Sequence, residues 1–159
     1  MVITATTTRG IHSLHIWHIE YQQTGAVEEL ISTVAMAHSN AIISICAVPA
    51  GTLRSRGVAC AFVTCSKGNG GTSTDDDRGT IRAWTMEGTT VEMQLEHGGF
   101  VEELHCQASV SQVMITVNNQ GHILLLAAYF GDSIGIERWN WNVLRRSRPG
   151  MLVILFFFR

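Results

Sequence analysis

The chain alternates between short strand-like runs and turn residues, and this pattern limits what it can fold into. Runs rich in Val, Ile, Thr and aromatic residues, bounded by Gly, Asn, Asp or Ser, are typical of β-strands. Fifteen glycines and only two prolines fit a chain of strands and turns. The sequence therefore predicts an all-β fold. The expected strands are 11–19, 41–48, 58–65, 80–85, 90–95, 101–106, 112–117, 122–129 and 134–139.

One stretch, Val27 to Ala37, is compatible with a helix. Its Thr33 and Val34 weaken that interpretation, because β-branched side chains lose rotamer freedom in a helix. We therefore expect a strand with a loop over this stretch, and no helix elsewhere in the chain.

Composition excludes several classes of protein. Hydrophobic residues make up 46% of the chain and charged residues 15%, which favours a packed core over disorder. A formal net charge of -2 argues against a nucleic-acid partner. The apolar run 151–158 is too short to span a bilayer as a helix, so no membrane partner is expected.

The four cysteines, at positions 46, 60, 65 and 106, fit neither a dense disulfide framework nor paired zinc ligands. Each lies in an apolar or alternating run, where a free cysteine behaves as a small core residue. No secretory signal pattern opens the sequence. We therefore expect an intracellular protein, cytoplasmic or nuclear.

Two tryptophans share the same upstream pattern, in which an acid precedes Trp by seven residues and an isoleucine precedes it by three. The matched residues are Asp77, Ile81 and Trp84 in one copy and Asp132, Ile136 and Trp139 in the other. Leu14 and Trp17 repeat the apolar-to-tryptophan spacing. This periodicity predicts a repeat architecture.

A histidine precedes two of the strand groups: Ala37-His38 stands before 41–48 and Glu96-His97 before 100–108. In these residues the sequence resembles the WD-repeat family of β-propellers. The best match runs from residue 37 to 84, where Ala37-His38 stands for the family's Gly-His and Ala83-Trp84-Thr85 for the region of its Trp-Asp. The resemblance implies propeller blades, each a four-stranded antiparallel sheet.

The resemblance also implies a buried hydrogen-bond relay. Its members here would be His38, Thr64 or Ser66, Asp77 and Trp84. Buried polar groups must be paired, so such a relay fixes the geometry of a blade and performs no chemistry. On this interpretation the acid triplet at 75–77 is a turn that leads into the strand 80–85.

The chain holds about three blades, whereas closed propellers typically have 4–8. We therefore expect an incomplete propeller over 1–144, either a part of a larger propeller or an incomplete gene product, with pieces near 1–25, 26–96 and 97–144. Residues 145–159 form a basic and then apolar tail that matches no blade. Its run Arg145 to Arg148 suggests either a solvated tail or a nuclear-import signal.

Two registers are open for the last blade. Either 100–108 is its first strand and 112–117 its second, or 109–121 opens the blade and 122–129 is its second strand. We favour the first register, because it gives His97 a place in the relay.

Other arrangements of chemically active residues are weaker. Three consecutive acids, Asp75 to Asp77, point in different directions and do not alternate as calcium ligands do. His12, His15 and His18 lie in a strand pattern that turns His15 away from the other two, which argues against zinc. The sequence predicts no metal site, no cofactor and no catalytic residue.

The function that follows from the resemblance is a non-catalytic protein–protein interaction scaffold. Long loops held on a rigid sheet are common binding sites, and the insertion 66–76 is the longest such turn. An unidentified protein or peptide would bind there. The candidate residues are Ser66, Lys67, Asp75, Asp76 and Arg78. The alternative is an enzyme on a propeller-like all-β fold that uses Asp and His as acid and base.

Overall fold

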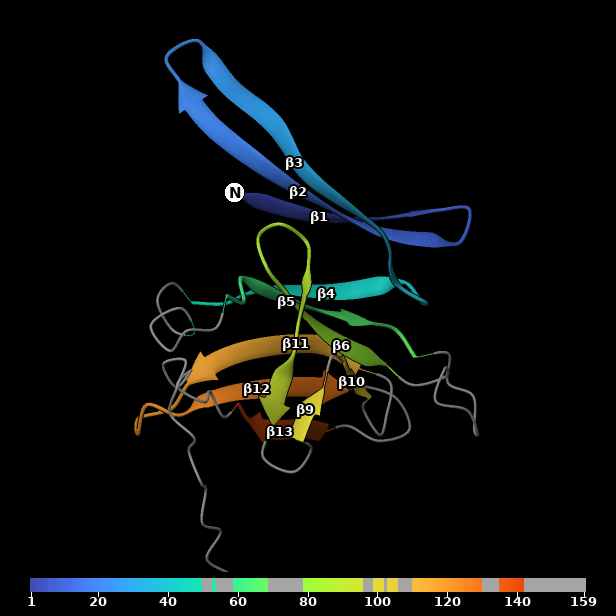
Figure 1. Ribbon diagram of the computed structural model, residues 1–159, viewed down its shortest axis with the longest axis vertical. Helices are drawn as coiled ribbons and strands as arrows, with labels where there is room; N and C mark the ends of the chain where they lie inside the picture. Colours follow the sequence, from blue (N-terminus) through green and yellow to red (C-terminus); the bar gives the residue numbers. More distant parts are fainter. Residues whose placement is uncertain are drawn as a thin grey trace, which may run out of the picture.

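The computed structural model describes residues 1–49, 53, 59–68, 79–95, 99–101, 103–105, 110–129 and 135–141. Within these ranges the protein is all-β, with no helix. The strands form three antiparallel sheets, none of them closed, and one small hairpin (Figure 1). We call the three the N-terminal, central and C-terminal sheets.

The N-terminal sheet has the order β1-β2-β3. Its strands are β1 (Val2–Thr8), β2 (Ile11–Gln22) and β3 (Gly25–His38). The turn between β1 and β2 is Arg9-Gly10, with φ of 51° and 78°. Positive φ at both central residues is the geometry of a two-residue hairpin loop whose twist matches that of the strands. The stretch from Val27 onward is thus extended, as expected, although β1 was not predicted.

The central sheet contains five strand segments in four strand positions. They are β4 (Ile42–Ala47), β5 (Phe62–Ser66), β6 (Thr80–Trp84), β7 (Thr90–Val91) and β10 (Glu103–His105). β4, β5 and β6 pair in chain order, and both β7 and β10 pair with β6.

β7 and β10 together form the fourth strand of the central sheet. Val91 pairs with Ala83, and Glu103 pairs with the next residue of β6, Arg82. The register therefore continues across the two segments, and the described residues between them, 92–95 and 99–101, leave the sheet. This excursion contains the hairpin β8 (Met93–Leu95) and β9 (Gly99–Val101).

The C-terminal sheet has the order β11-β12-β13. Its strands are β11 (Val110–Val117), β12 (Ile123–Tyr129) and β13 (Gly135–Asn140). The register favoured from the sequence is therefore wrong: β11 is the first strand of this sheet, and 103–105 belongs to the central sheet. The preference rested on His97, which lies outside the described residues.

The expected pieces near 1–25, 26–96 and 97–144 also differ from the observed sheets. The tight turn before Gly25, where φ is 135°, returns the chain along β2, so that 25–38 completes the N-terminal sheet. At the other boundary, the strand 103–105 completes the central sheet. The tail 145–159 lies outside the described residues.

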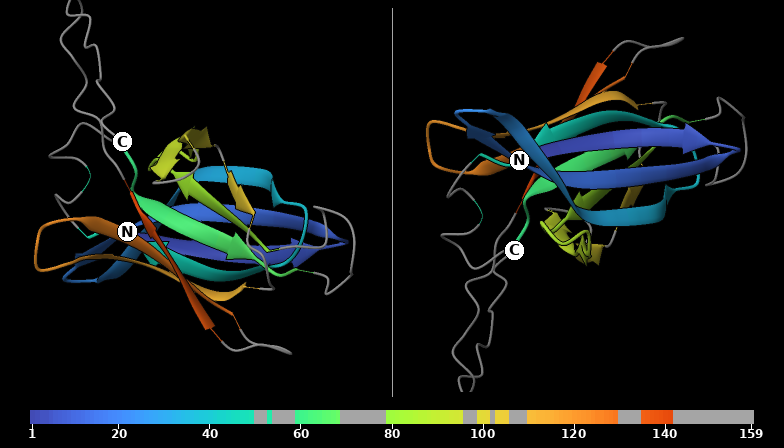
Figure 2. Two further views of the ribbon diagram at one scale, coloured as in Figure 1. Left: turned by 90° about the horizontal axis from the view of Figure 1, so that it is seen from below. Right: turned by 90° about the horizontal axis from the view of Figure 1, so that it is seen from above.

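The sheets stack face to face, with the central sheet in the middle (Figures 1 and 2). One hydrophobic cluster fills the junction with the N-terminal sheet; its buried members are Leu14, Ile16, Ala37, Phe62 and Trp84. A larger cluster fills the junction with the C-terminal sheet and includes Val63, Cys65, Ile81, Ala83, Val113, Ile115, Leu125 and Ala127. Successive side chains of β5 and β6 point to opposite faces of the central sheet, so the two strands contribute residues to both clusters.

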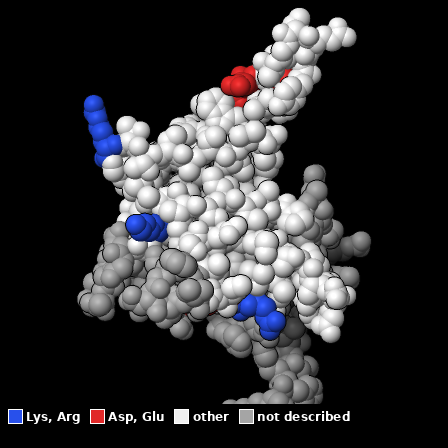
Figure 3. Space-filling view, turned by 180° about the vertical axis from the view of Figure 1, so that it is seen from behind, with Lys and Arg blue, Asp and Glu red and all other residues white. Residues whose placement is uncertain are grey.

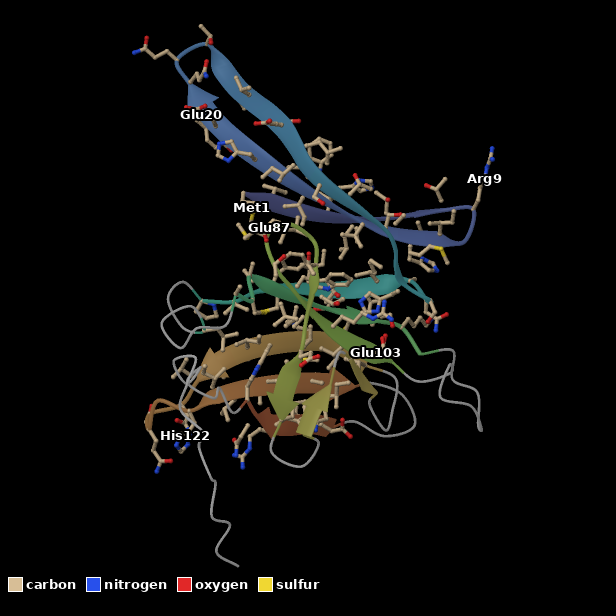
Figure 4. The ribbon with its side chains drawn as sticks, in the orientation of Figure 1. Met1, Arg9, Glu20, Glu87, Glu103 and His122 are labelled. Carbon is tan, nitrogen blue, oxygen red and sulfur yellow. The ribbon has the colours of Figure 1, made fainter. Side chains whose placement is uncertain are left out.

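The turn between β6 and β7 packs against the N-terminal sheet. Glu87, at its tip, lies against the N-terminal sheet (Figure 4), and Ser32 Oγ donates a hydrogen bond to the Glu87 carbonyl at 3.0 Å. Gly88 has a φ of 84°, and a Cβ atom there would lie 2.5 Å from Cγ2 of Val34. A glycine at this position is thus required by both backbone conformation and packing.

We expect Gly88→Ala to destabilise the fold more than Gly121→Ala. Both glycines have positive φ, 84° and 80°, but a Cβ at Gly121 meets nothing within 4 Å. Gly121→Ala should cost about 1–2 kcal/mol from backbone strain alone. Gly88→Ala should cost about 1–3 kcal/mol more because of overpacking. Urea unfolding of both variants provides the measurement, and Val34→Ala should remove most of the excess. Equal costs would contradict the observed packing of the two sheets.

Candidate functional site

A chain of buried hydrogen bonds joins the N-terminal sheet to the central sheet. His38 is the last residue of β3, and its side chain lies over β5 and β6 on one face of the central sheet. His38 Nε2 lies 2.7 Å from Thr64 Oγ1, and Trp84 Nε1 donates to the same oxygen at 2.7 Å. His38, Thr64 and Trp84 are 2%, 0% and 2% exposed. The structure therefore brings together three of the four residues expected in the relay.

The chain continues through two more hydroxyl groups. His38 Nδ1 lies 2.9 Å from Thr80 Oγ1, which in turn lies 2.8 Å from Ser66 Oγ. The Thr80 backbone N–H also donates to Ser66 Oγ. We call these five residues, His38, Thr64, Ser66, Thr80 and Trp84, the relay.

Strand alternation places the relay on one face of the central sheet. Thr64 and Ser66 are two residues apart on β5, and Thr80 and Trp84 are four apart on β6, so all four side chains point the same way. Phe62 lies on this face too and stacks on Trp84, with ring centroids 6.4 Å apart. The face looks toward the N-terminal sheet, whose last strand delivers His38.

The hydrogen-bond pattern is satisfied by a neutral His38. A neutral imidazole has one donor and one acceptor nitrogen. The ring of His38 therefore donates a hydrogen bond to one of the two threonine hydroxyls and accepts one from the other. Burial, reinforced by the positive charge of Arg82 and by His12, lowers the pKa of His38 from 6.5 to about 3. At neutral pH the ring is therefore uncharged, and both nitrogens have partners.

Arg82 makes a second connection between the same sheets. It lies on β6, donates from a terminal nitrogen to the Ala37 carbonyl and pairs through Nε with the Glu103 carboxylate. Glu103 stands opposite Arg82 on β10. Both side chains are about a quarter exposed. Arg82 thus connects β6 both to the end of β3 and to β10 in the fourth strand.

Several predicted site residues lie outside the described residues, namely Asp75, Asp76, Asp77, Arg78 and His97. Within the described residues, the second ring nitrogen of His38 is hydrogen-bonded to Thr80, which the resemblance did not name. Thr80 was not predicted from the sequence as a member of the relay. Its position two and four residues before Arg82 and Trp84 could have indicated it, since alternation puts all three on one face.

The two described members of the predicted binding loop differ from each other. Lys67 is exposed, and its backbone N–H bonds the Ala41 carbonyl at 2.8 Å. Ser66, by contrast, is the last residue of β5 and is fully buried. Its hydroxyl is used in the relay, so it is not available to a partner. The expectation that Ser66 belongs to an exposed loop differs from the structure, because β5 extends one residue further than predicted.

The N-terminal sheet repeats the tryptophan–threonine pair of the relay. Trp17 Nε1 donates to Thr4 Oγ1 at 3.0 Å. Val2 pairs with Trp17, and Phe62 pairs with Trp84. In each sheet the threonine lies two residues after this partner of the tryptophan. In the C-terminal sheet the same register puts Ala127 in the threonine position relative to Trp139. The three tryptophans thus occupy equivalent positions, although only two have the hydroxyl partner.

Other candidate groups form no site in the described part of the chain. His12 and His15 bond hydroxyls on β1, His12 to Thr7 and His15 to Thr6, at 2.9 Å each. No three described side chains of the types that bind metals converge on one point. Nor do the described residues include a helix that would cross a bilayer.

The described cysteines, Cys46, Cys60 and Cys65, are free thiols. Cys60 and Cys65 lie in the larger hydrophobic cluster, as expected of small core residues. Burial raises the pKa of each of these two thiols to about 12. They are therefore protonated at neutral pH and are poor nucleophiles.

The relay joins two sheets, and in the described part of the chain its side chains are buried and not exposed to a substrate. Every one of its side chains is buried, its histidine is neutral, and its hydroxyls bond one another. Buried polar groups in such a network specify one relative position of the elements that carry them, because any shift leaves a group unpaired.

Breaking the Thr64–Trp84 bond should reveal a coupling of about 1–2 kcal/mol. Thr64→Val keeps the shape of the side chain but leaves the Trp84 N–H and one His38 nitrogen without a partner. A double-mutant cycle of Thr64→Val with Trp84→Phe, followed by urea unfolding, measures the coupling.

The matched control is the cycle of Thr4→Val with Trp17→Phe. This pair has the same register, but Thr4 is exposed, so water replaces the lost bond and the coupling should be well under 1 kcal/mol. Equal couplings in the two cycles would contradict the structural importance of burial at the relay.

Acid should destabilise the protein through His38. Its pKa is about 3 in the folded state and about 6.5 in the unfolded chain, so the unfolded state binds the extra proton between these values. The contribution of His38 is complete above pH 6.5 and is lost as the pH falls toward 3. The slope should approach about 1.4 kcal/mol per pH unit near pH 4–5. Denaturation of the wild type and of His38→Gln across this range isolates the contribution, which must be absent from the variant.

Comparison of the chain with known protein families, with curated proteins and with solved structures returned no match. Its function must therefore be inferred from the geometry of the sheets and of the relay.

Proposed function

We propose that the protein is a non-catalytic protein–protein interaction scaffold of the WD-repeat type, whose three stacked sheets are blades of a propeller. The observation that carries the proposal is the bond sequence His38–Thr64–Trp84 across two sheets. It joins the residue types, and the positions, that the resemblance to the family assigns to a structural relay.

The stacking of the sheets also supports this proposal. The central sheet has four strand positions in meander order, and its neighbours cover both of its faces. Consecutive sheets that pack face to face and repeat the register of one tryptophan are the arrangement expected of successive blades. Of the described acid–base candidates, His38 is a member of the relay, and no specific observation favours the enzyme alternative.

A binding loop is proposed at 67–78, on a stem that the structure fixes. Ser66 and Thr80 are bonded at 2.8 Å, and a Cβ atom at Gly79 would lie 3.0 Å from the Ser66 carbonyl. The chain therefore leaves and returns at one point that is held by the relay. Long segments on a rigid stem are where binding function concentrates. Asp75 and Asp76 favour a partner with a basic surface.

We expect Asp75→Asn with Asp76→Asn to reduce partner recovery while leaving the unfolding temperature unchanged. The protein serves as bait in a cell extract, and quantitative mass spectrometry compares proteins recovered by the wild type and the variant. Binding that depends on these acids should also weaken at higher salt, because ions screen exposed charges.

The matched control neutralises two other exposed acids, Glu28 and Glu29, on the projecting β2–β3 hairpin. Acidic side chains lie near the projecting end of this hairpin (Figure 3). Glu28→Gln with Glu29→Gln should leave recovery unchanged. Equal recovery by the loop variant and the control would refute the proposed binding loop.

A further inference from the structure

The outer face of the N-terminal sheet, turned away from the central sheet, repeats the face of the central sheet that receives it. The two faces can be aligned by their strand pairing, because Val2 pairs with Trp17 as Phe62 pairs with Trp84. Five positions then match in order: Thr4, Thr6, Ser13, His15 and Trp17 correspond to Thr64, Ser66, Thr80, Arg82 and Trp84. Hydroxyl residues match hydroxyl residues, a basic residue matches a basic residue, and tryptophan matches tryptophan.

The contacts on the two faces match as well. Trp17 donates to Thr4 as Trp84 donates to Thr64. His15 Nδ1 lies 3.1 Å from Oγ1 of Thr33, which neighbours it on β3. Arg82 pairs in the same way with its neighbour on the fourth strand of the central sheet. The outer face is therefore built like a receiving face.

One feature distinguishes the two faces. Thr64 also bonds a histidine that the adjacent sheet delivers, whereas the described residues bring no histidine to Thr4. Thr4 is exposed, and Trp17 is half-buried. The outer face thus has the pattern of a sheet junction without the second sheet.

The outer face of the C-terminal sheet has the complementary pattern. At the two observed junctions the covering face is apolar, and Leu14 and Ile81 occupy its equivalent positions. The same register assigns Ile136 to this position in the C-terminal sheet. Ile136 is 71% exposed, and Met114, on the same face, is 47% exposed. Leu126, which pairs with Met114, adds an apolar residue to this face. Its other neighbour, the exposed Arg138, stands where the observed junctions have Ile16 and Ala83.

We propose that two copies of this chain associate head to tail, with the outer face of each C-terminal sheet covering the outer face of the other copy's N-terminal sheet. The chain itself supplies both halves of the contact, in the register of the observed junctions. Two copies bring six sheets, within the range of 4–8 that closed propellers contain. A contact between unlike faces closes into a ring when the rotation allows it. The inference rests on the proposed arrangement of the sheets as blades.

Sedimentation equilibrium of the wild type should give a mass twice the 17.5 kDa of the chain. Thr4→Arg on one face and Ile136→Arg on the other should each weaken self-association at least tenfold, because each introduces a charge into a contact that buries it. Both residues are exposed, so thermal unfolding of the variants should match that of the wild type diluted to its monomer, because loss of the dimer removes only the stabilisation that comes from association. Gln120→Arg, in an exposed turn, is the control and should remain a dimer.

Mixing the two single variants gives the sharpest test. Each mixed pair retains one contact between unmodified faces, so an equimolar mixture should regain association that neither variant shows alone. A contact between two identical faces would lose association with one variant only and would gain nothing on mixing. Thr6→Arg with Met114→Arg repeats the test at other exposed positions of the same faces.

A wild type that remains a monomer at every concentration would overturn the inference, as would a dimer that survives either variant or a mixture that fails to associate. Assemblies larger than two copies that the same variants abolish would contradict closure. If the chain is a monomer while the Thr64–Trp84 coupling and the acid-dependent partner recovery both hold, this inference alone fails and the proposed scaffold stands.

Discussion

The pairing of His38 with Thr64 and Thr80 is the interaction on which the stacking of the first two sheets depends. Hydrophobic contact between the sheets is strong but non-directional, and it would tolerate a shift of one sheet over the other. The relay tolerates no shift, because its five side chains are buried and each uses another as its partner. Burial thus supplies the free energy of association, and the relay selects one position.

Sequence reasoning predicted the parts of this arrangement that leave a local signal. Alternating and apolar runs indicated most strands, and the spacing of the tryptophans indicated the repeat. His38, Thr64 and Trp84 could be named because the resemblance assigns roles to their residue types. Thr80 was missed because a threonine at the start of a strand is common, and only the register of β6 against β5 gives it a partner.

What could not be predicted depends on pairing between distant segments. The fourth strand of the central sheet is made from two pieces, and nothing in either piece shows that residues 103–105 continue the register of 90–91. The return of 25–38 along β2 is set by a turn that lacks a strong sequence signal. Ser66 was assigned to a loop because Lys67 and Gly68 follow it, whereas its burial accompanies a bond to Thr80 across the sheet.

Residues of a strand usually both pair in a sheet and pack in the core. In the excursion between β7 and β10 these two roles are separate. The ladder of β6 would remain continuous without residues 92–102, since Val91 and Glu103 already face adjacent positions. The core would not, because Met93 and Leu95 are 0% and 4% exposed and belong to the larger cluster. Leu95 also bridges to Trp141, just beyond the last strand. The described part of this segment thus stabilises the fold by completing the hydrophobic cluster between the central and C-terminal sheets, although it adds nothing to the ladder of β6.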